Sequence, residues 1–356
     1  MPGGIQAQVN GVPSPAVAGD FADGNPGFRV VSGPGGLVSG STIYGTPLVT
    51  GSAGGVGGTA IVGRFGWLSQ QTIDPDNAAT IVNSFWTPNS GVSNAVTGIV
   101  AASAPDGFIS RPDSPAIIIT YLADGTMTIQ QGAPVPLWAG GRAFWVVNNG
   151  SSQALVGQKC YADLASGQAS FAATGTPSFA SSSAATVAAG SWSGTGSING
   201  NVMTVGSVTG VVAIGATVSY SGATSNAIIV EQLTSTAVGG ASGGAGTYAL
   251  SAGEFTVASG TGLSGVYGVL TIGGTITGAF EIGGVVTGTL LSFAAGTQIT
   301  GFGTGGGGAG TYYVSTQTSA ITGAQAIHFT TNVETQWIAR SSGASGEIVK
   351  ISTIVQ

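Results

Sequence analysis

The sequence predicts an all-β fold: a β-barrel or sandwich domain with an extended N-terminal arm, and an inserted glycine-rich domain of β repeats. The 64 glycines among 356 residues exclude a helix-rich chain, because each glycine inside a helix costs about 1 kcal/mol relative to alanine. Val, Ile and Thr fall in alternating runs, which is typical of strands and not of disordered chains. All 14 prolines lie at or before Pro177, and no Lys or Arg lies between Lys159 and Arg340, so the chain divides into parts of different composition.

Charge narrows the classes of function. Only 6% of the residues are charged and the net charge is −6, where about 25% charged residues is usual. An acidic surface is repelled by phosphate backbones, so we expect no nucleic-acid partner. No run reaches the roughly 18 apolar residues of a membrane span, and we expect no membrane role. The first six residues lack the basic and apolar stretches of a signal peptide, so we expect synthesis in a cytoplasm without export by that route.

Residues 1–55 are predicted to form the extended N-terminal arm. Turn-forming pairs recur there, such as Asn10-Gly11, Asp23-Gly24 and Asn25-Pro26. An arm this irregular is expected to be ordered by contact with something else, such as another subunit.

Residues 56–175 carry the strand signals of the first domain. Three hairpins are predicted: residues 116–121 with 127–130 around Asp124-Gly125, residues 142–147 with 154–156 around Asn149-Gly150, and residues 159–162 with 168–171 across Ser166-Gly167. Four tryptophans, at positions 67, 86, 138 and 145, supply bulk for the core. Charge and a tryptophan return after His328, so residues 328–356 are predicted to complete this domain, with residues 347–352 as one of its strands.

Residues 176–192 are rich in Ala, Ser and Thr and are predicted to be a linker. Beyond them, residues 193–327 are predicted to form an inserted β domain of two repeats, at about 193–255 and 260–327. The clearest match joins residues 244–251 to residues 308–315, and the matched segments are roughly 64 to 68 residues apart. Small side chains bury little area, so we expect the repeats to stack on each other or on neighbouring subunits.

Candidate chemical groups are few. His328 is the only histidine and lies in a strand pattern, and the single Cys160 is expected to be a buried structural thiol. Asp20 with Asp23, and Asp74 with Asp76, could offer oxygens to calcium, but aspartate is usual in such turns. Residues 303–308 formally match a dinucleotide G-x-G-x-x-G, yet no helix is expected to follow. We therefore predict no catalytic, cofactor-binding or metal-binding residue, no cofactor and no enzyme. A polysaccharide-degrading enzyme with a carboxylate pair is the least favoured alternative.

Several short motifs carry a family resemblance. Residues 5–10 (Ile-Gln-Ala-Gln-Val-Asn), residues 156–159 with Tyr161-Ala162, Ser170-Phe171, and residues 346–353 resemble the capsid cement or head decoration proteins of tailed bacteriophages. The resemblance covers about residues 1–175 and 330–356, and the inserted middle departs from the compact form of such cements. It implies a structural virion protein on the outer surface of the capsid. Its implied partners are the major capsid protein, across subunit junctions, and other copies of itself, with a trimer favoured.

Two further expectations follow. The first domain and the arm are expected to grip the shell while the repeats project outward, so deleting residues 180–327 should leave shell binding intact. The alternative is a phage fibre or spike adhesin that binds host-surface glycans through the repeats. In that reading Tyr312 and Tyr313 form an exposed aromatic pair that stacks on sugars.

Overall fold

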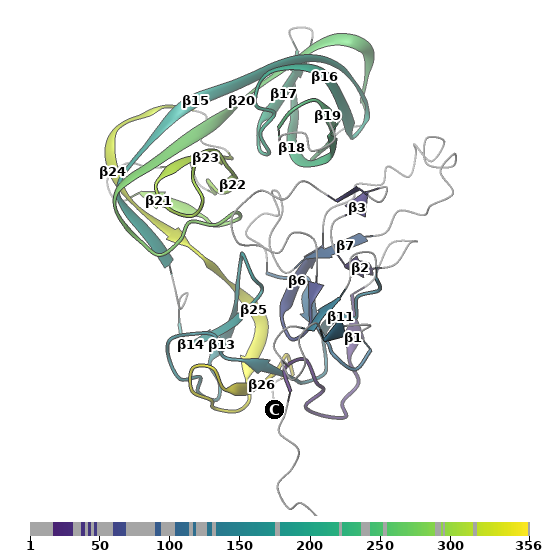
Figure 1. Ribbon diagram of the computed structural model, residues 1–356, viewed down its shortest axis with the longest axis vertical. Coiled ribbons are helices and arrows are strands. Elements are labelled where there is room, and N and C mark those ends of the chain that lie inside the picture. The colour runs from purple at the N-terminus through teal and green to yellow at the C-terminus, as the bar shows by residue number, and fades with distance from the viewer. Residues whose placement is uncertain are drawn as a thin grey trace, which may run out of the picture.

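The fold consists of strands. The computed structural model describes residues 17–30, 37–39, 42–43, 46–47, 60–68, 90–93, 104–113, 117–118, 127–129, 133–174, 179–220, 223–235, 243–251, 255–288, 293–294, 296–315 and 319–354. Across these residues it contains strands and no helix, so the all-β prediction is confirmed. The described residues accordingly include no helix able to cross a bilayer. The termini of the described chain lie in the lower half of Figure 1, and the long strands arch over the top.

We call the described residues from 17 to 174 together with those from 332 to 354 the front module. Its strands are β1 (Phe28–Arg29), β2 (Leu37–Ser39), β3 (Thr42–Ile43), β4 (Thr46–Pro47), β5 (Ala60–Ile61), β6 (Phe65–Leu68), β7 (Ser90–Ser93), β8 (Gly107–Ile109), β9 (Ile117–Ile118), β10 (Met127–Ile129), β11 (Leu137–Gly140), β12 (Phe144–Val147), β13 (Lys159–Asp163), β14 (Ala169–Ala172), β25 (Asn332–Ala339) and β26 (Ile348–Ser352).

Two sheets of the front module share one core. One sheet has the order β1-β11-β8-β6-β7-β2 and the other β12-β26-β25-β13-β14, while β5-β10-β9 and β3-β4 form smaller sheets. Phe65 and Phe108 come from the first sheet, and Phe144 and Trp337 from the second, and all four are buried in one cluster. The strand expected at residues 347–352 is β26, which lies antiparallel to β12.

A closed barrel, one of the two expected architectures, is not observed in the front module. Closure requires the two edge strands to pair along their length, but β12 and β14 approach each other only at the bridge between Asn148 and Ala169. The remaining edge of β12 is occupied by residues 19–22. The Gly19 amide donates to the Trp145 carbonyl at 2.8 Å, and the Ala22 amide donates to the Ala143 carbonyl at 2.9 Å.

The described part of the arm is ordered by its own chain. Phe21 packs against Trp138 and Phe144, with ring centroids 5.6 Å away in both cases. Residues 19–22 are therefore ordered by contacts within their own chain, while the expectation that another subunit orders the rest of the arm stays a prediction. Residues 1–16, and with them the resembling motif at 5–10, lie outside the described residues.

Two of the three expected hairpin pairings are present. β9 pairs with β10, and β13 pairs with β14, both antiparallel. Residues 142–147 do not pair with 154–156, because β12 pairs with β26 instead and Ala154 bridges Gly343. The reason lies in Asn148, whose buried amide donates to the carbonyls of Ser152 at 2.8 Å and Gly343 at 3.2 Å. These bonds hold the chain after β12 as an anchored loop.

We call residues 179–330 the insert. Its strands are β15 (Phe179–Gly200), β16 (Val202–Gly210), β17 (Thr217–Tyr220), β18 (Ala223–Ser235), β19 (Gly246–Leu250), β20 (Phe255–Thr277), β21 (Val286–Gly288), β22 (Ile299–Phe302), β23 (Gly310–Val314) and β24 (Ile321–Thr330). Residues 176–192, expected to be a linker, therefore contribute most of their length to a 22-residue strand. Their small Ala, Ser and Thr side chains suit close pairing with β20. Residues Ser181 to Gly200 of β15 pair antiparallel with β20.

The long strands β15 and β20 connect two separate cores. From β15, pairings lead through β16, β19, β18 and β17 back to β20 on one side, around the core that contains Trp192 and Tyr248. On the other side, β24 with β21 and β23 with β22 flank a second core that contains Phe280 and Tyr312. Figure 1 shows β15 and β20 side by side along the top of the molecule, spanning both groups of strands.

The same tyrosine contact occurs in both cores. The Tyr248 hydroxyl donates to the Gly244 carbonyl, and the Tyr312 hydroxyl donates to the Gly308 carbonyl at 2.5 Å. Both rings are fully buried. The matching Gly-Ala-Gly-Thr-Tyr segments thus adopt the same local structure.

A second contact also recurs. Gly215 and Gly283 have φ values of 89° and 91°, a left-handed conformation that favours glycine. The Gly215 amide donates to the Ile229 carbonyl at 2.7 Å, and the Gly283 amide donates to the Ile299 carbonyl at 2.8 Å.

Candidate functional site

An apolar hollow lies at the lower end of the front module. It encloses about 500 Å³ and is formed by residues before and in β1, at the end of β11, in β25 and after β26. Its lining residues are Pro26, Phe28, Ala139, Gly140, Gly141, Gln336, Thr353 and Ile354. These residues come from four distant parts of the sequence, so only the fold brings them together.

Two large apolar side chains of this hollow face solvent. Phe28 is 68% exposed and Ile354 is 38% exposed. Gly141 lies directly against Phe28: its φ is +84°, and a β-carbon there would lie 2.8 Å from the Phe28 ring.

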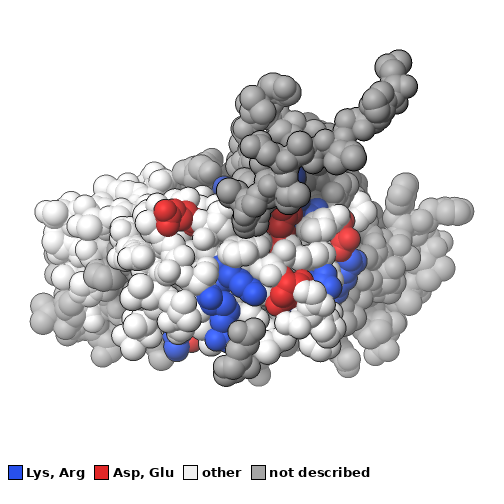
Figure 2. Space-filling view, turned by 90° about the horizontal axis from the view of Figure 1, so that it is seen from below, with Lys and Arg blue, Asp and Glu red and all other residues white. Residues whose placement is uncertain are grey.

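Three arginines border the hollow, and we call Arg29, Arg142 and Arg340 the arginine rim. Arg29 follows Phe28 and lies over the Trp138 ring, 4.9 Å from its centroid. Arg142 follows Gly141 and lies 4.1 Å from the centroid of the Phe21 ring. Arg340 donates to the Ile354 carbonyl. Figure 2, which views this end from below, shows cationic side chains gathered beside acidic ones.

The rim arginines differ in their partners. Arg29 forms an ion pair with Asp113 at 2.7 Å, and both side chains are about half exposed. The Arg142 Nε atom donates to the Asn25 carbonyl at 2.8 Å. Within the described part of the chain, Arg142 and Arg340 lie in no ion pair. Two positive charges of an acidic protein therefore lie beside an apolar surface without a carboxylate partner among the described residues.

A buried carboxylate lies where the insert meets the front module. Glu281 accepts a hydrogen bond from the Ala165 amide, and its Oε2 atom is buried without a partner among the described residues. Burial raises the pKa of Glu281 to about 8, and the nearby Asp163 adds to the rise. Burial lowers the pKa of Arg64, an effect that Asp163 partly offsets. Arg64 also donates to the Ser166 carbonyl at 3.2 Å. Residues 163–166 are therefore close to Arg64 of the front module and to Glu281 of the insert.

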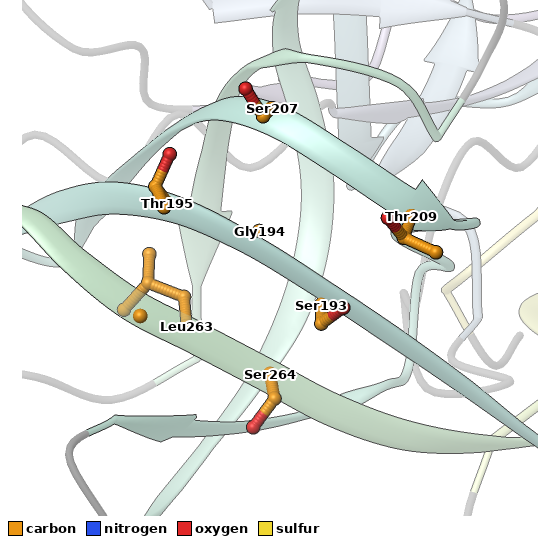
Figure 3. Close-up of a pocket in the computed structure, with 8 residues that line it drawn as sticks. Ser193, Gly194, Thr195, Ser207, Thr209, Leu263 and Ser264 are labelled. Atoms are coloured by element: carbon orange, nitrogen blue, oxygen red, sulfur yellow. The ribbon is translucent and has the colours of Figure 1, made fainter.

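A surface hollow of the insert has no charged side chain in its lining. A shallow hollow of about 580 Å³ lies over β15, β16 and β20 and is lined by Ser, Thr, Gly and one Leu. Ser193 is in register with Thr209 on one side and with Ser264 on the other. Figure 3 shows the hydroxyl groups of Thr195 and Ser207 pointing the same way. No lining residue can donate or accept a proton near neutral pH, so this surface offers hydrogen bonds but no acid–base group.

The expected candidate residues do not come together. His328 is exposed in β24, in register with Ser181 and Thr287. Asp20 pairs with Arg111 at 3.2 Å, and Asp23 accepts bonds from the Asn25 and Ala143 amides, which is the turn role expected of it. Asp74 and Asp76 lie outside the described residues. Within the described part of the chain, no three His, Cys, Asp or Glu side chains gather as metal ligands would.

The tyrosine pair expected to stack on sugars is not exposed as a pair. Tyr312 is 0% exposed, and only Tyr313 retains partial exposure. Residues 303–308 form the turn before β23, in which the Gly303 amide donates to the Thr311 carbonyl at 2.8 Å. A strand follows this glycine run, where a dinucleotide site requires a helix.

Cys160 is expected to be unreactive in the native protein. The side chain is buried in β13, and burial raises the pKa of its thiol, so little nucleophilic thiolate forms near neutral pH. We expect maleimide labelling to be at least about 100-fold slower in buffer than in guanidinium chloride. Intact-protein mass spectrometry measures this ratio, and comparable rates in both solvents would show that β13 is open in the native state.

Sequence reasoning missed three features of these surfaces. Asn148 belongs to an Asn-Asn-Gly run that reads as a simple turn. Arg142 and Arg340 are isolated in the sequence, and no local pattern links them to Phe28 or Ile354. Glu281 is one of three carboxylates in a segment without Lys or Arg, and that isolation is the one signal that could have marked it.

Comparison with known proteins adds no assignment: no family model matches the chain, and neither a curated protein nor a solved structure matches it.

Proposed function

We propose that this protein is a structural protein of a phage virion, a cement or decoration protein. In this proposal the front module binds the outer surface of the head and stabilises contacts between major capsid subunits. The main support for the proposal is that the front module and the insert differ in charge and in apolar surface. The front module holds all seven Lys and Arg residues and the apolar hollow, whereas the insert has only Glu231, Glu254 and Glu281 as charged residues.

A binding module of this kind does not need a deep pocket. A protein that holds neighbouring subunits together makes modest contacts that are repeated over a symmetric shell, and the repetition raises the overall affinity. The hollow and the arginine rim suit such a contact, because aromatic and arginine side chains supply most of the binding energy at protein interfaces. We further propose that the protein acts as a homo-oligomer, a trimer, and that neither nucleic acid nor a membrane is its partner.

The insert is proposed to be two copies of one β unit that project from the shell. The repeated tyrosine and glycine contacts support this proposal, as does the presence of one core on each side of β15 and β20. A strand of 22 residues spans roughly 70 Å when extended. Two long paired strands would give a projecting unit a rigid axis.

The register at the base of the insert allows a direct test. Phe179 is the cross-strand partner of Thr330, so the two ends of the insert lie on adjacent strands. Replacing residues 180–329 by Asn-Gly, the residues of a tight hairpin turn, should close the front module without strain. We expect this variant to cosediment with heads that lack the protein, with an affinity within about threefold of the full chain.

The control for this experiment is the isolated insert, residues 179–330, which should not cosediment. A shortened variant that keeps its β-type circular dichroism but no longer binds heads would contradict the proposed division of labour. Binding by the isolated insert would contradict it as well. The adhesin alternative has lost the exposed tyrosine pair on which it was based, because Tyr312 is buried.

A further inference from the structure

We infer that the apolar hollow of the front module binds an acidic peptide segment, whose apolar side chain enters the hollow while flanking carboxylates contact Arg142 and Arg340. The inference rests on the proposed function only for the source of the segment, which would be an exposed loop or terminus of the shell subunit. The hollow itself is a feature of this chain.

The hollow contains exposed apolar side chains. Five large apolar side chains of the described residues are markedly exposed, and two of them, Phe28 and Ile354, line this one hollow. Scattered exposed residues need no explanation, but apolar residues that converge in a concavity are typical of a binding site. Gly140 and Gly141 pack closely against Thr353 and Phe28, and all four residues line the hollow.

The arginines beside the hollow can bind a negatively charged partner. The chain has a net charge of −6, yet Arg142 and Arg340 lie in no ion pair with the described residues. Arg340 donates to the carbonyl of Ile354, which places its guanidinium group at the border of the hollow. A guanidinium group binds a carboxylate through two parallel hydrogen bonds, so a partner with Asp or Glu satisfies both arginines.

The distribution of charge around the hollow favours a peptide over a nucleic acid. Phosphates also bind arginine, but a nucleic-acid groove follows a continuous run of positive charge. Here Asp113 neutralises Arg29 at 2.7 Å. The hollow is lined mainly by apolar groups, with Gln336 and Thr353 as its polar side chains. In addition, β1 is the outermost strand of its sheet, and edge strands are common docking sites for extended peptides.

The probe is a fluorescein-labelled hexapeptide, Asp-Asp-Leu-Phe-Asp-Asp, with Lys-Lys-Leu-Phe-Lys-Lys as its charge-reversed counterpart. We measure fluorescence anisotropy against the full-length chain at low and at moderate ionic strength. The acidic peptide should bind at least about tenfold more tightly than the basic one, and salt should weaken its binding. Equal binding of both peptides would overturn the inference, as would tighter binding of a labelled oligothymidylate.

Four variants locate the site. Phe28→Ser and the double variant Arg142→Ala/Arg340→Ala should each weaken the acidic peptide about tenfold or more. Ile354→Glu places a negative charge at the hollow without altering the core and should have the same effect. Lys159→Ala removes a cation that pairs with Glu334 outside the hollow, and binding should be unchanged. If the hollow variants retain full binding while Lys159→Ala loses it, the site is wrong.

The same variants separate this inference from the proposed function. If heads bind the full chain and the hollow variants equally well, the shell contact lies elsewhere and the inference fails while the proposed function stands. If the acidic peptide requires Phe28 and the arginines but heads bind no form of the chain, the hollow is a peptide site and the proposed function fails.

Discussion

Replacing Trp337 by alanine is expected to lower the free energy of unfolding by about 3–5 kcal/mol, the cost of removing a large side chain from a packed core. Trp337 is 1% exposed and lies in the core shared by the two sheets of the front module. The ring centroids of Phe144, Phe108 and Phe65 lie 5.4, 6.1 and 6.5 Å from its own. No other side chain can fill the cavity, because these rings are themselves fixed between two sheets. Guanidinium unfolding followed by circular dichroism measures the change.

The matched control is Trp145→Ala. Trp145 lies one residue after Phe144 in β12 and is partly exposed, because successive side chains of a strand point to opposite faces. We expect its loss to cost less than half as much as the loss of Trp337. If both variants unfold at the same denaturant concentration, the shared core is not where the two sheets meet.

Replacing Glu281 by glutamine is expected to remove a pH dependence of stability. The folded protein raises the pKa of this carboxyl from 4.5 to about 8, so it favours the protonated form. The folded state therefore holds a proton that the unfolded chain has released between these pH values, and stability falls as pH rises through this window. The total loss is roughly 5 kcal/mol at most. Glutamine is neutral at every pH and can still accept the bond from Ala165, so the variant should be more stable than the native protein above pH 8.

The measurement is the midpoint of urea unfolding at several pH values between 4 and 9. Glu334→Gln serves as the control, because Glu334 is about half exposed and forms a surface ion pair with Lys159. Such pairs contribute on the order of 0–1 kcal/mol, so this variant should follow the pH profile of the native protein. If Glu281→Gln also keeps that profile, the carboxylate is solvated and the contact between the insert and the front module is loose.

The strands of this protein were predictable where the local sequence decides them. The pairing of β13 with β14 follows from apolar runs on both sides of Ser166-Gly167, a signal confined to a few residues. The pairing of β12 was not predictable locally, because its partner β26 lies some 200 residues later and competes with the nearer segment at 154–156. The strand β15 was missed for a different reason: Ala and Ser have weak β propensity, and only pairing with β20 stabilises the extended conformation.

The hollow was not predictable at all. Its residues lie near positions 26–28, 139–141, 336 and 353–354, and none of these segments has a distinctive sequence motif. Their convergence depends on β1 pairing with β11 and on β26 lying between β12 and β25.

The order of strands in the five-stranded sheet has a consequence for synthesis. β25 and β26 lie inside the sheet β12-β26-β25-β13-β14, yet they leave the ribosome after the whole insert. The nascent chain can therefore complete the insert before the strands that cover Phe144 and Phe171 have been synthesised. Until then these two side chains are exposed, and chaperones bind exposed apolar side chains of this kind. A translation product that stops before Trp337 would carry a folded insert and no finished front module. Such incomplete chains would expose apolar core residues, and we expect them to be sensitive to proteolysis.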